Sequence, residues 1–352
     1  MTTSGTVGQT VIDVQGLIDH AIRRCGVIAE QITSEIQEIA RENAYMMLSA
    51  WANRGIPLWC LDDIVVGFQA DQYIYTLPVG TVDVTTVNYR MPVVANSGTI
   101  TASTGTVASA TDQNVSTFMQ QSAPNGTVTL DSGSGLTQYI TSIGILPYGN
   151  ATYSLVLEWS TDGSTWNTLY TVGSASYTDM VWAYWNIDPG QNCRYYRIRE
   201  AGGATLALRE VQFIAGVREI SMGRLNVDDY SQLPSKNFTT MLPPTFWFAK
   251  RLTPQIYVWG VPNSAFNQMA VWRQRHIQDV GALTNTLEVP QRWLQAVRDS
   301  LAWECLPEIP KADMTRAELL KTAAEASYRE ASDADRDKSP IYLSPNISYY
   351  TR

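Results

Sequence analysis

Between residues 153 and 166 the chain reads Tyr153-Ser154-Leu155-Val156-Leu157-Glu158-Trp159-Ser160-Thr161-Asp162-Gly163-Ser164-Thr165-Trp166. Apolar and polar side chains alternate up to Asp162-Gly163, a dipeptide typical of tight turns, after which a second strand begins. Two later runs alternate in the same way, Cys193-Arg194-Tyr195-Tyr196-Arg197-Ile198-Arg199 and Leu206-Ala207-Leu208-Arg209-Glu210-Val211-Gln212-Phe213. Such alternation indicates strands with one buried and one wet face. The pattern predicts a β-sandwich over residues 91–217.

Four pieces of this block occur in the order and spacing of a known domain. They are Thr111-Asp112-Gln113-Asn114-Val115-Ser116-Thr117, Ser160-Thr161-Asp162-Gly163-Ser164-Thr165-Trp166, Arg194-Tyr195-Tyr196-Arg197-Ile198 and Leu208-Arg209-Glu210-Val211. In these pieces the block resembles the coagulation factor 5/8 type C, or discoidin-like, domain, a jelly roll of the galactose-binding superfold. The resemblance implies a binding module without catalysis. The chain departs from the family at Phe118, where the family has Trp, and its loops carry few aromatic residues to stack on a sugar.

The residues on either side of the block have a different pattern. Apolar residues at helical spacing predict a helix over 11–26 that ends at Cys25-Gly26, and a second from Thr33 or Ser34 to Gly55. Two hairpins are expected, one joining 64–69 to 73–78 and one joining 255–263 to 268–273. A further helix begins near Pro290, and a last one over about 315–333 starts with a Thr315/Glu318 capping box.

The flanking strand patterns indicate an insertion. Residues 82–90 read as a strand that runs into the block, and 217–222 resume a strand pattern after it. Insertion of the sandwich at the turn between two neighbouring strands would separate them in the sequence in this way. Such an insertion is feasible because the ends of a domain lie close together. The sequence therefore predicts an α+β chain with a discontinuous domain of residues 1–90 and 218–333, an inserted sandwich of 91–217 and an extended C-terminal arm of 334–352.

With the insertion removed, the outer part resembles the head-to-tail adaptor, or connector, proteins of short-tailed bacteriophages. The residues that carry the likeness are Leu48-Ser49-Ala50-Trp51-Ala52-Asn53-Arg54-Gly55-Ile56-Pro57-Leu58-Trp59, Tyr75-Thr76-Leu77-Pro78, Asp229-Tyr230-Ser231-Gln232-Leu233-Pro234-Ser235-Lys236, Pro244-Thr245-Phe246-Trp247-Phe248 and Ile256-Tyr257-Val258-Trp259-Gly260-Val261-Pro262. The resemblance implies a homo-oligomeric ring, a dodecamer, that docks under the portal protein and joins it to a tail nozzle or tail tube protein. Genome DNA would pass through the channel without specific binding.

The last residues of the chain favour an extended arm. Two prolines, Pro340 and Pro345, oppose a helix there, and tyrosines and aliphatic residues are frequent. Such a segment can bury its rings and add strand hydrogen bonds on a partner. The expected portal-binding residues are Ile341, Tyr342, Leu343, Ile347, Tyr349 and Tyr350.

Composition narrows the function classes. The chain has 352 residues and a formal net charge of −8, which argues against a surface that grips nucleic acid. It has no apolar run long enough to span a membrane and no signal-peptide pattern, so we expect assembly in a cytoplasm. Residence in the virion is what the adaptor resemblance implies. The four cysteines are scattered and are expected to be buried free thiols. We find no catalytic set and predict no enzyme activity, cofactor or metal.

Two acidic residues of the sandwich allow a second interpretation. Asp112 and Glu210 match positions that, in relatives of the domain, lie near a structural calcium. A surface turn and a strand-edge charge are the simpler interpretation, because a hard cation needs six or more oxygen ligands.

Two functional hypotheses remain, and they differ in class. The first is a structural virion protein, the adaptor ring between portal and tail, with the sandwich facing outward towards capsid, fibre or glycan. The alternative is a glycan-binding module of a tail spike or another host-facing virion protein, in which the outer part is only a mount.

Overall fold

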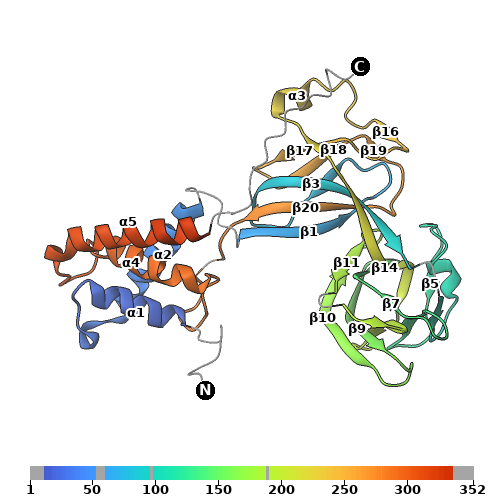
Figure 1. Cartoon of the computed structure of the whole chain (residues 1–352), viewed down its shortest axis with the longest axis horizontal. Coiled ribbons are helices and arrows are strands. Elements are labelled where there is room, and N and C mark those ends of the chain that lie inside the picture. Colours follow the sequence, from blue (N-terminus) through green and yellow to red (C-terminus); the bar gives the residue numbers. More distant parts are fainter. Residues whose placement is uncertain (1–11, 53–59, 96–97, 188–189, 279, 336–352) are drawn as a thin grey trace. The chain divides into compact units, whose positions relative to one another are not determined.

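The computed structural model describes residues 12–52, 60–95, 98–187, 190–278 and 280–335. They belong to two compact units, residues 1–62 with 274–352 and residues 63–273. The first unit is built from helices and the second mostly from strands (Figure 1).

The helical unit contains α1 (Val14–Arg24), α2 (Ser34–Ala52), α4 (Leu294–Cys305) and α5 (Ala317–Ala334), with 3-10 turns at Ala29–Gln31, Gln291–Trp293 and Met314–Arg316. Each helix contributes apolar residues to one core, among them Ile22, Trp51, Leu301 and Leu320. Trp51, Trp293 and Tyr328 pack ring against ring, with ring centroids 5.1–5.6 Å apart. The four cysteines of the chain are free and buried, which confirms that prediction.

Local sequence signals predicted the end of α1 and the start of α2 correctly, but they predicted the cap before α5 wrongly. Helix α1 ends at Gly26, whose φ of 93° is the left-handed conformation that glycine adopts without strain. Helix α2 begins at Ser34, as expected. The predicted Thr315/Glu318 capping box is wrong, because the carboxylate of Asp313 accepts hydrogen bonds from the amide and the hydroxyl of Thr315, at 3.1 and 2.6 Å.

The β unit contains three main sheets. One has seven strands in the order β1 (Leu61–Gly67), β20 (Gln268–Arg275), β3 (Thr81–Val94), β14 (Ala207–Ser221), β8 (Ser142–Pro147) and β11 (Ala183–Asn186), with β5 (Met119–Gln120) paired to β14. The second is β10 (Asn167–Tyr177), β9 (Ala151–Ser160), β13 (Tyr195–Glu200), β6 (Thr127–Asp131) and β4 (Thr99–Ala102). The third is β15 (Gly223–Arg224), β17 (Phe246–Lys250), β18 (Gln255–Trp259) and β2 (Ile74–Thr76).

Shorter elements complete the unit. They are the pairs β12 (Asn192–Cys193) with β7 (Gln138–Tyr139) and β16 (Thr239–Thr240) with β19 (Val261–Pro262), the 3-10 turn Val107–Ala110 and the helix α3 (Val227–Ser231).

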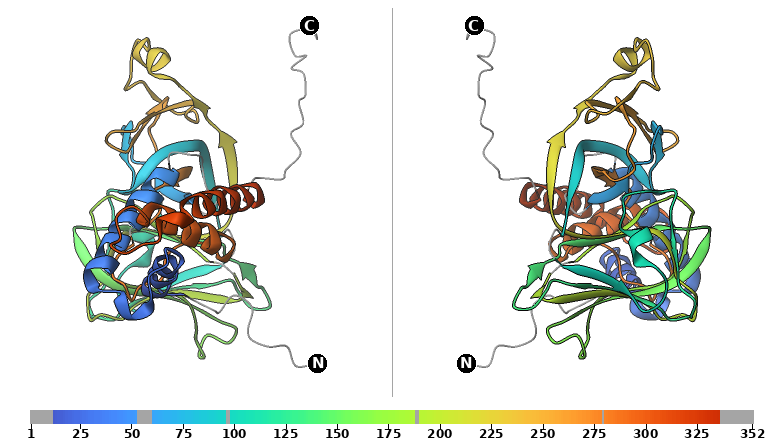
Figure 2. Two further views of the ribbon diagram at one scale, coloured as in Figure 1. Left: turned by 90° about the vertical axis from the view of Figure 1, so that its left-hand side faces the viewer. Right: turned by 90° about the vertical axis from the view of Figure 1, so that its right-hand side faces the viewer.

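The sandwich interrupts a pair of neighbouring strands. Strand β3 enters it and β14 leaves it, and the two are antiparallel partners from Ile214 opposite Val94 to Ser221 opposite Asn88. Figure 2 shows the two strands side by side. The expected proximity of residues 82–90 and 217–222 is therefore confirmed.

The core of the sandwich lies between two layers. The five-stranded sheet supplies Leu130, Leu155 and Ile198, and the β5, β8 and β14 part of the seven-stranded sheet supplies Ile145 and Phe213, all fully buried. Alternate residues of β9 and β13 point into this core, as their sequence pattern predicted. A β-sandwich in this region is confirmed.

The two predicted hairpins do not form. Strands β1 and β2 belong to different sheets, and so do β18 and β20. The chain passes from the sheet of β1 to the sheet of β2 through a turn at Asp71, which has a positive φ of 62°. The amide of Asp71 donates a hydrogen bond to the carbonyl of Pro262. The strands were correctly expected, but their partners are distant in sequence.

The compact units divide the chain differently from the predicted domains. The helices bury one core, whereas residues of the four-stranded sheet and of the β1, β20 and β3 part of the seven-stranded sheet form another, which contains Phe68, Val87, Trp247 and Met269. The α+β class describes the whole chain. That residues 1–90 and 218–333 act as one adaptor domain stays a prediction.

Side chains as well as strands fix the sandwich to the rest of the β unit. The indole of Trp182, just before β11, donates a hydrogen bond to the carbonyl of Ala265 at 2.7 Å and stacks on Tyr184. Two glycines make room for these rings. A Cβ on Gly67 would lie 2.6 Å from Trp182, and a Cβ on Gly144 would lie 2.3 Å from the ring of Tyr184.

We expect Gly144→Ala to destabilise the β unit by about 1–3 kcal/mol, because the added methyl group forces Tyr184 out of a filled site. Denaturant unfolding of the full chain measures the change. Gly216→Ala is the matched control, since its Cβ would meet no atom within 4 Å. Equal stability of the two variants would contradict the tight packing.

Candidate functional site

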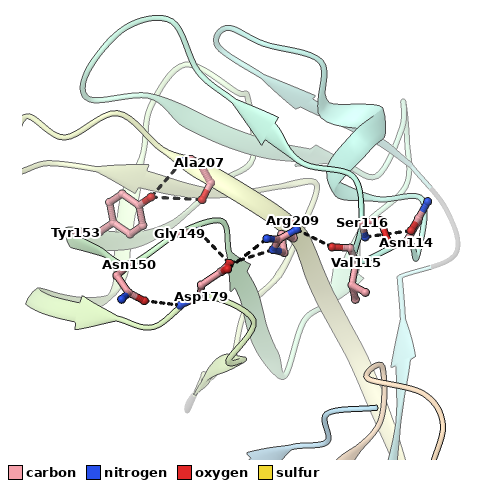
Figure 3. Close-up of polar contacts among 9 residues, drawn as sticks. All are labelled: Asn114, Val115, Ser116, Gly149, Asn150, Tyr153, Asp179, Ala207 and Arg209. Carbon is pink, nitrogen blue, oxygen red and sulfur yellow. Dashed lines mark hydrogen bonds and ion pairs between the residues drawn. The ribbon is translucent and has the colours of Figure 1, made fainter. Parts of the chain in front are cut away.

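Three loops of the sandwich meet beside the first residues of β14. They are residues 111–118, 147–150 and 178–180, and Figure 3 shows the side chains that join them. Because the three loops come from separate parts of the chain, the site exists only when the sandwich is folded.

Arg209 is the residue that links the three loops. Its Nε donates to Oδ1 of Asp179 at 3.0 Å and its Nη1 donates to the carbonyl of Val115 at 2.8 Å. The amide of Gly149 donates to the same Asp179 oxygen at 2.9 Å. The guanidinium lowers the pKa of Asp179, so its carboxylate stays charged at neutral pH.

Two further contacts hold this arrangement (Figure 3). The side-chain oxygen of Asn150 accepts a hydrogen bond from the amide of Asp179 at 2.9 Å. The hydroxyl of Tyr153 accepts from the amide of Ala207 at 3.2 Å and lies 3.3 Å from its carbonyl oxygen. The loop that carries Asp179 and the start of β14 are thereby held in place.

Two aromatic rings lie next to these polar groups. Phe118 and Tyr148 stack face to face, with ring centroids 3.6 Å apart and an angle of 4° between the planes. The guanidinium carbon of Arg209 lies 4.8 Å from the Tyr148 ring centroid. Phe118 is 38% exposed and Tyr148 is 37% exposed, so the pair presents apolar surface to solvent.

The loop of residues 111–117 is braced by its own side chains. The carboxylate of Asp112 accepts from the amide of Asn114 at 3.0 Å and from the hydroxyl of Thr117 at 2.9 Å. Glu210 on β14 accepts from the Asn114 amide at 2.8 Å and is only 2% exposed. Burial, with Asp112 as a second, smaller cause, raises the pKa of Glu210 to about 7.

These contacts bear on the calcium interpretation. The structure brings Asp112 and Glu210 together, but they are only two carboxylates. Over the described ranges of the chain there is no group of three or more His, Cys, Asp or Glu residues that could hold a metal ion. Asp112 lies in an exposed turn, as the simpler interpretation expected, but Glu210 is not a strand-edge charge, because it lies within β14 opposite β8 and is buried.

The other candidate residues lie elsewhere. The expected portal-binding residues Ile341, Tyr342, Leu343, Ile347, Tyr349 and Tyr350 lie outside the described residues, and their role stays a prediction. Among the helices that the structure describes, none is long and apolar enough to cross a membrane.

Sequence reasoning missed most of this site. Arg209 and Asn114 belong to pieces already singled out for the discoidin-like resemblance, and Phe118 was noted as a departure from it. Tyr148 and Asp179 carried no signal, because neither lies in a recognisable motif. Tyr148 and Asp179 gain a common role only because the folded chain brings their loops together.

Comparison with known proteins gives likenesses to solved structures over about a third of the chain. The family 32 carbohydrate-binding module of AlyQ, in complex with 4,5-unsaturated mannuronic acid, is 18% identical, and the match covers 34% of this chain and 95% of that module, with a TM-score of 0.29. The module CpGH89CBM32-6 of Clostridium perfringens is 17% identical over 34% of this chain and 95% of that one, with a TM-score of 0.31. What these modules bind is a property of those proteins.

A third likeness is to the family 62 module of Clostridium thermocellum Xyl5A, which is 24% identical over 34% of this chain and 97% of that one, with a TM-score of 0.30. No family model matches the chain, and no curated protein matches it.

We expect Glu210 to make the stability of the protein fall as the pH rises. Its pKa is raised from 4.5 to about 7 in the folded chain, so the folded state holds a proton that the unfolded state has released. The stabilising contribution is complete below about pH 4.5 and is lost as the pH passes about 7. Glu210→Gln cannot lose this proton, and the stability difference between variant and wild type should change by roughly 3 kcal/mol across this range.

Urea unfolding at several pH values measures the difference. Glu219→Gln is the control, because the pKa of Glu219 is lowered and its titration lies below this range. A difference for Glu210→Gln that stays constant with pH would show that the folded state does not retain the proton.

Proposed function

We propose that the inserted sandwich is a carbohydrate-binding module and that the rest of the chain mounts it on a virion. The observation that carries the proposal is the exposed pair of Phe118 and Tyr148 beside the fixed polar groups of Arg209, Asp179 and Asn150. On this proposal the protein is a binding protein and not an enzyme.

The chemistry of the site suits a sugar. A pyranose ring has an apolar face of C–H groups that packs on an aromatic ring, and hydroxyl groups around its edge that bond to carboxylates, guanidinium groups and amides. Binding sites commonly combine such apolar surface with a few well-placed polar groups. Here the aromatic pair supplies the apolar surface, and the remaining lone pairs of Asp179 and the side-chain amide of Asn150 supply the polar groups.

Contacts within the protein hold the loops in their arrangement. Arg209 binds the loop of residues 111–118, Asp179 binds the loop of residues 147–150, and Asp112 braces the first of these two loops from within. A site whose side chains are fixed beforehand loses less conformational freedom on binding. This compensates for the weak individual contacts that a neutral sugar makes.

We expect Phe118→Ala to weaken saccharide binding by about tenfold or more, because it removes the exposed ring. Phe118 stacks on Tyr148, and its loss leaves the bonds of Arg209 and Asp179 intact. The measurement is titration calorimetry of the full chain against a panel of neutral, amino and uronic acid oligosaccharides.

The matched control is Tyr170→Ala, which removes an exposed aromatic ring from β10. It should bind the same oligosaccharides as the wild type does. No binding by the wild type to any member of the panel, or equal loss in both variants, would overturn the proposed site.

The adaptor role is a second candidate for the rest of the chain, and it is compatible with a glycan-binding sandwich. One observation favours it. Three of the segments that carry the likeness to adaptors, residues 75–78, 244–248 and 256–262, contribute β2, β17 and β18 to one small sheet. Segments that are far apart in the sequence but carry the likeness together are thus neighbours in the fold.

We expect the full chain to form rings on the isolated portal protein, as seen by electron microscopy, and a chain truncated after Lys338 to lose this binding. The reason is that the removed residues hold the tyrosines and aliphatic residues expected to contact the portal. Equal ring formation by the truncated chain would remove the arm from the mechanism, and failure of both chains to bind would remove the adaptor role.

A further inference from the structure

A carboxylate is tied to the chain beside each ring of the aromatic pair. The hydroxyl of Thr117, which precedes Phe118, donates a hydrogen bond to the carboxylate of Asp112 at 2.9 Å. The backbone amide of the residue that follows Tyr148 donates to the carboxylate of Asp179, also at 2.9 Å. A ligand that packs on the exposed aromatic surface therefore comes close to two carboxylates.

Both carboxylates are charged and reach solvent. Asp112 is exposed, and the side chain of Asp179 is 38% exposed. Hydrogen bonds from Thr117 lower the pKa of Asp112, and hydrogen bonds from Arg209 lower the pKa of Asp179, so both are ionised at neutral pH. Oδ2 of Asp179 lies 3.3 Å from Nη2 of Arg209, longer than the usual N–H···O distance of about 2.9 Å. This oxygen can accept a further, shorter hydrogen bond.

The guanidinium of Arg209 is turned into the protein. Its Nε and Nη2 donate to Asp179, and its Nη1 donates to the carbonyl of Val115 (Figure 3). The ring of Tyr148 lies beside the guanidinium carbon, and the arginine side chain is only 14% exposed. Arg209 compensates the charge of one carboxylate, so the surface that a ligand meets is negative.

The rest of the sandwich adds to this negative potential. Residues 91–217 contain eight aspartates and glutamates, four arginines and no lysine or histidine, a formal net charge of −4. The other three arginines already bind carboxylates of the five-stranded sheet, and they lie at β13, outside the three loops of the site; the pairs are Arg194 with Asp131, and Arg197 and Arg199 with Glu158. A field of one sign attracts ligands of the opposite sign and repels those of the same sign.

We propose that this site selects saccharides with a free amino group and rejects acidic saccharides, with Asp179 as the residue that binds the ammonium group. The inference rests on the carbohydrate binding proposed above and names its ligand class. An ammonium group carries three N–H donors and a positive charge, so it can donate to Oδ2 of Asp179 while the sugar ring packs on Phe118. The carboxylate of a uronic acid at the same place would meet two like charges.

The first test compares matched methyl glycosides binding to the full chain at about pH 6, where an amine is protonated. The glucose and galactose series are each used as the neutral sugar, the free 2-amine, the N-acetylated 2-amine and the uronic acid. Dissociation constants come from saturation-transfer NMR titrations. In at least one series the free amine should bind about fivefold or more tighter than its neutral and N-acetylated counterparts, and the uronic acid should bind more weakly than the neutral sugar.

Salt separates the charge contribution from the rest of the binding. Raising NaCl from about 0.05 M to about 0.5 M should weaken binding of the amine and leave binding of the neutral sugar unchanged, because screening acts on charges. Neutral sugars or uronic acids that bind as tightly as the amines would overturn this inference and leave the proposed carbohydrate binding intact. Absence of binding by every glycoside would overturn both. These wild-type measurements do not depend on the folding of a variant.

The second test removes the carboxylate. Asp179→Asn should abolish the preference for the amine, because the neutral side chain keeps an oxygen for hydrogen bonds but has no charge. Asp131→Asn is the matched control, since Asp131 also accepts hydrogen bonds from an arginine and a glycine amide and its side chain is 32% exposed, but it lies on β6 outside the loops of the site. An unchanged preference in Asp179→Asn, or an equal loss in Asp131→Asn, would contradict the role of Asp179.

Discussion

The structure of the β unit depends on the pairing of β3 with β14. Strand β3 has 14 residues and β14 has 15. Each strand has one end in the sandwich, and its other end lies in the part of the seven-stranded sheet outside the sandwich. Antiparallel partners lie about 5 Å apart, so this ladder holds both ends of the inserted sandwich at adjacent positions. An insertion joined by a ladder of hydrogen bonds has far less freedom than one joined by two flexible linkers.

The contact of Trp182 with Ala265 restricts that freedom further. The ladder alone leaves the sandwich free to twist about two strands, but a third point of attachment away from the ladder opposes the twist. Both glycines at this contact, Gly67 and Gly144, are needed for the close approach of an aromatic ring and not for an unusual backbone conformation. The loops that carry the candidate site are therefore presented at a defined orientation within the β unit.

Sequence reasoning succeeded where a few adjacent residues decide the structure. The stop of α1 at Gly26, the turn at Asp162-Gly163 and the alternation of β13 are local, and each was expected before the fold was known. Sequence reasoning failed where the pairing strand is distant in the sequence. Residues 64–69 and 73–78 are strands, but their partners are β20 and β18, some 180 or more residues away. The candidate site was missed for the same reason, since Asp179 gains its role only from Arg209, Gly149 and Asn150 on other segments.

The attachment of the sandwich matters for the sugar binding proposed for it. The loops around Arg209 lie at the first residues of β14, and the last residues of β14 pair with β3 outside the sandwich. A virion that carried several copies of the chain would display several such sites. Because single sugar contacts are weak, two sites held at a fixed spacing bind a surface with many sugars much more tightly than one site does. Rigid attachment of the sandwich is then an advantage, because a fixed spacing keeps the second site within reach once the first has bound.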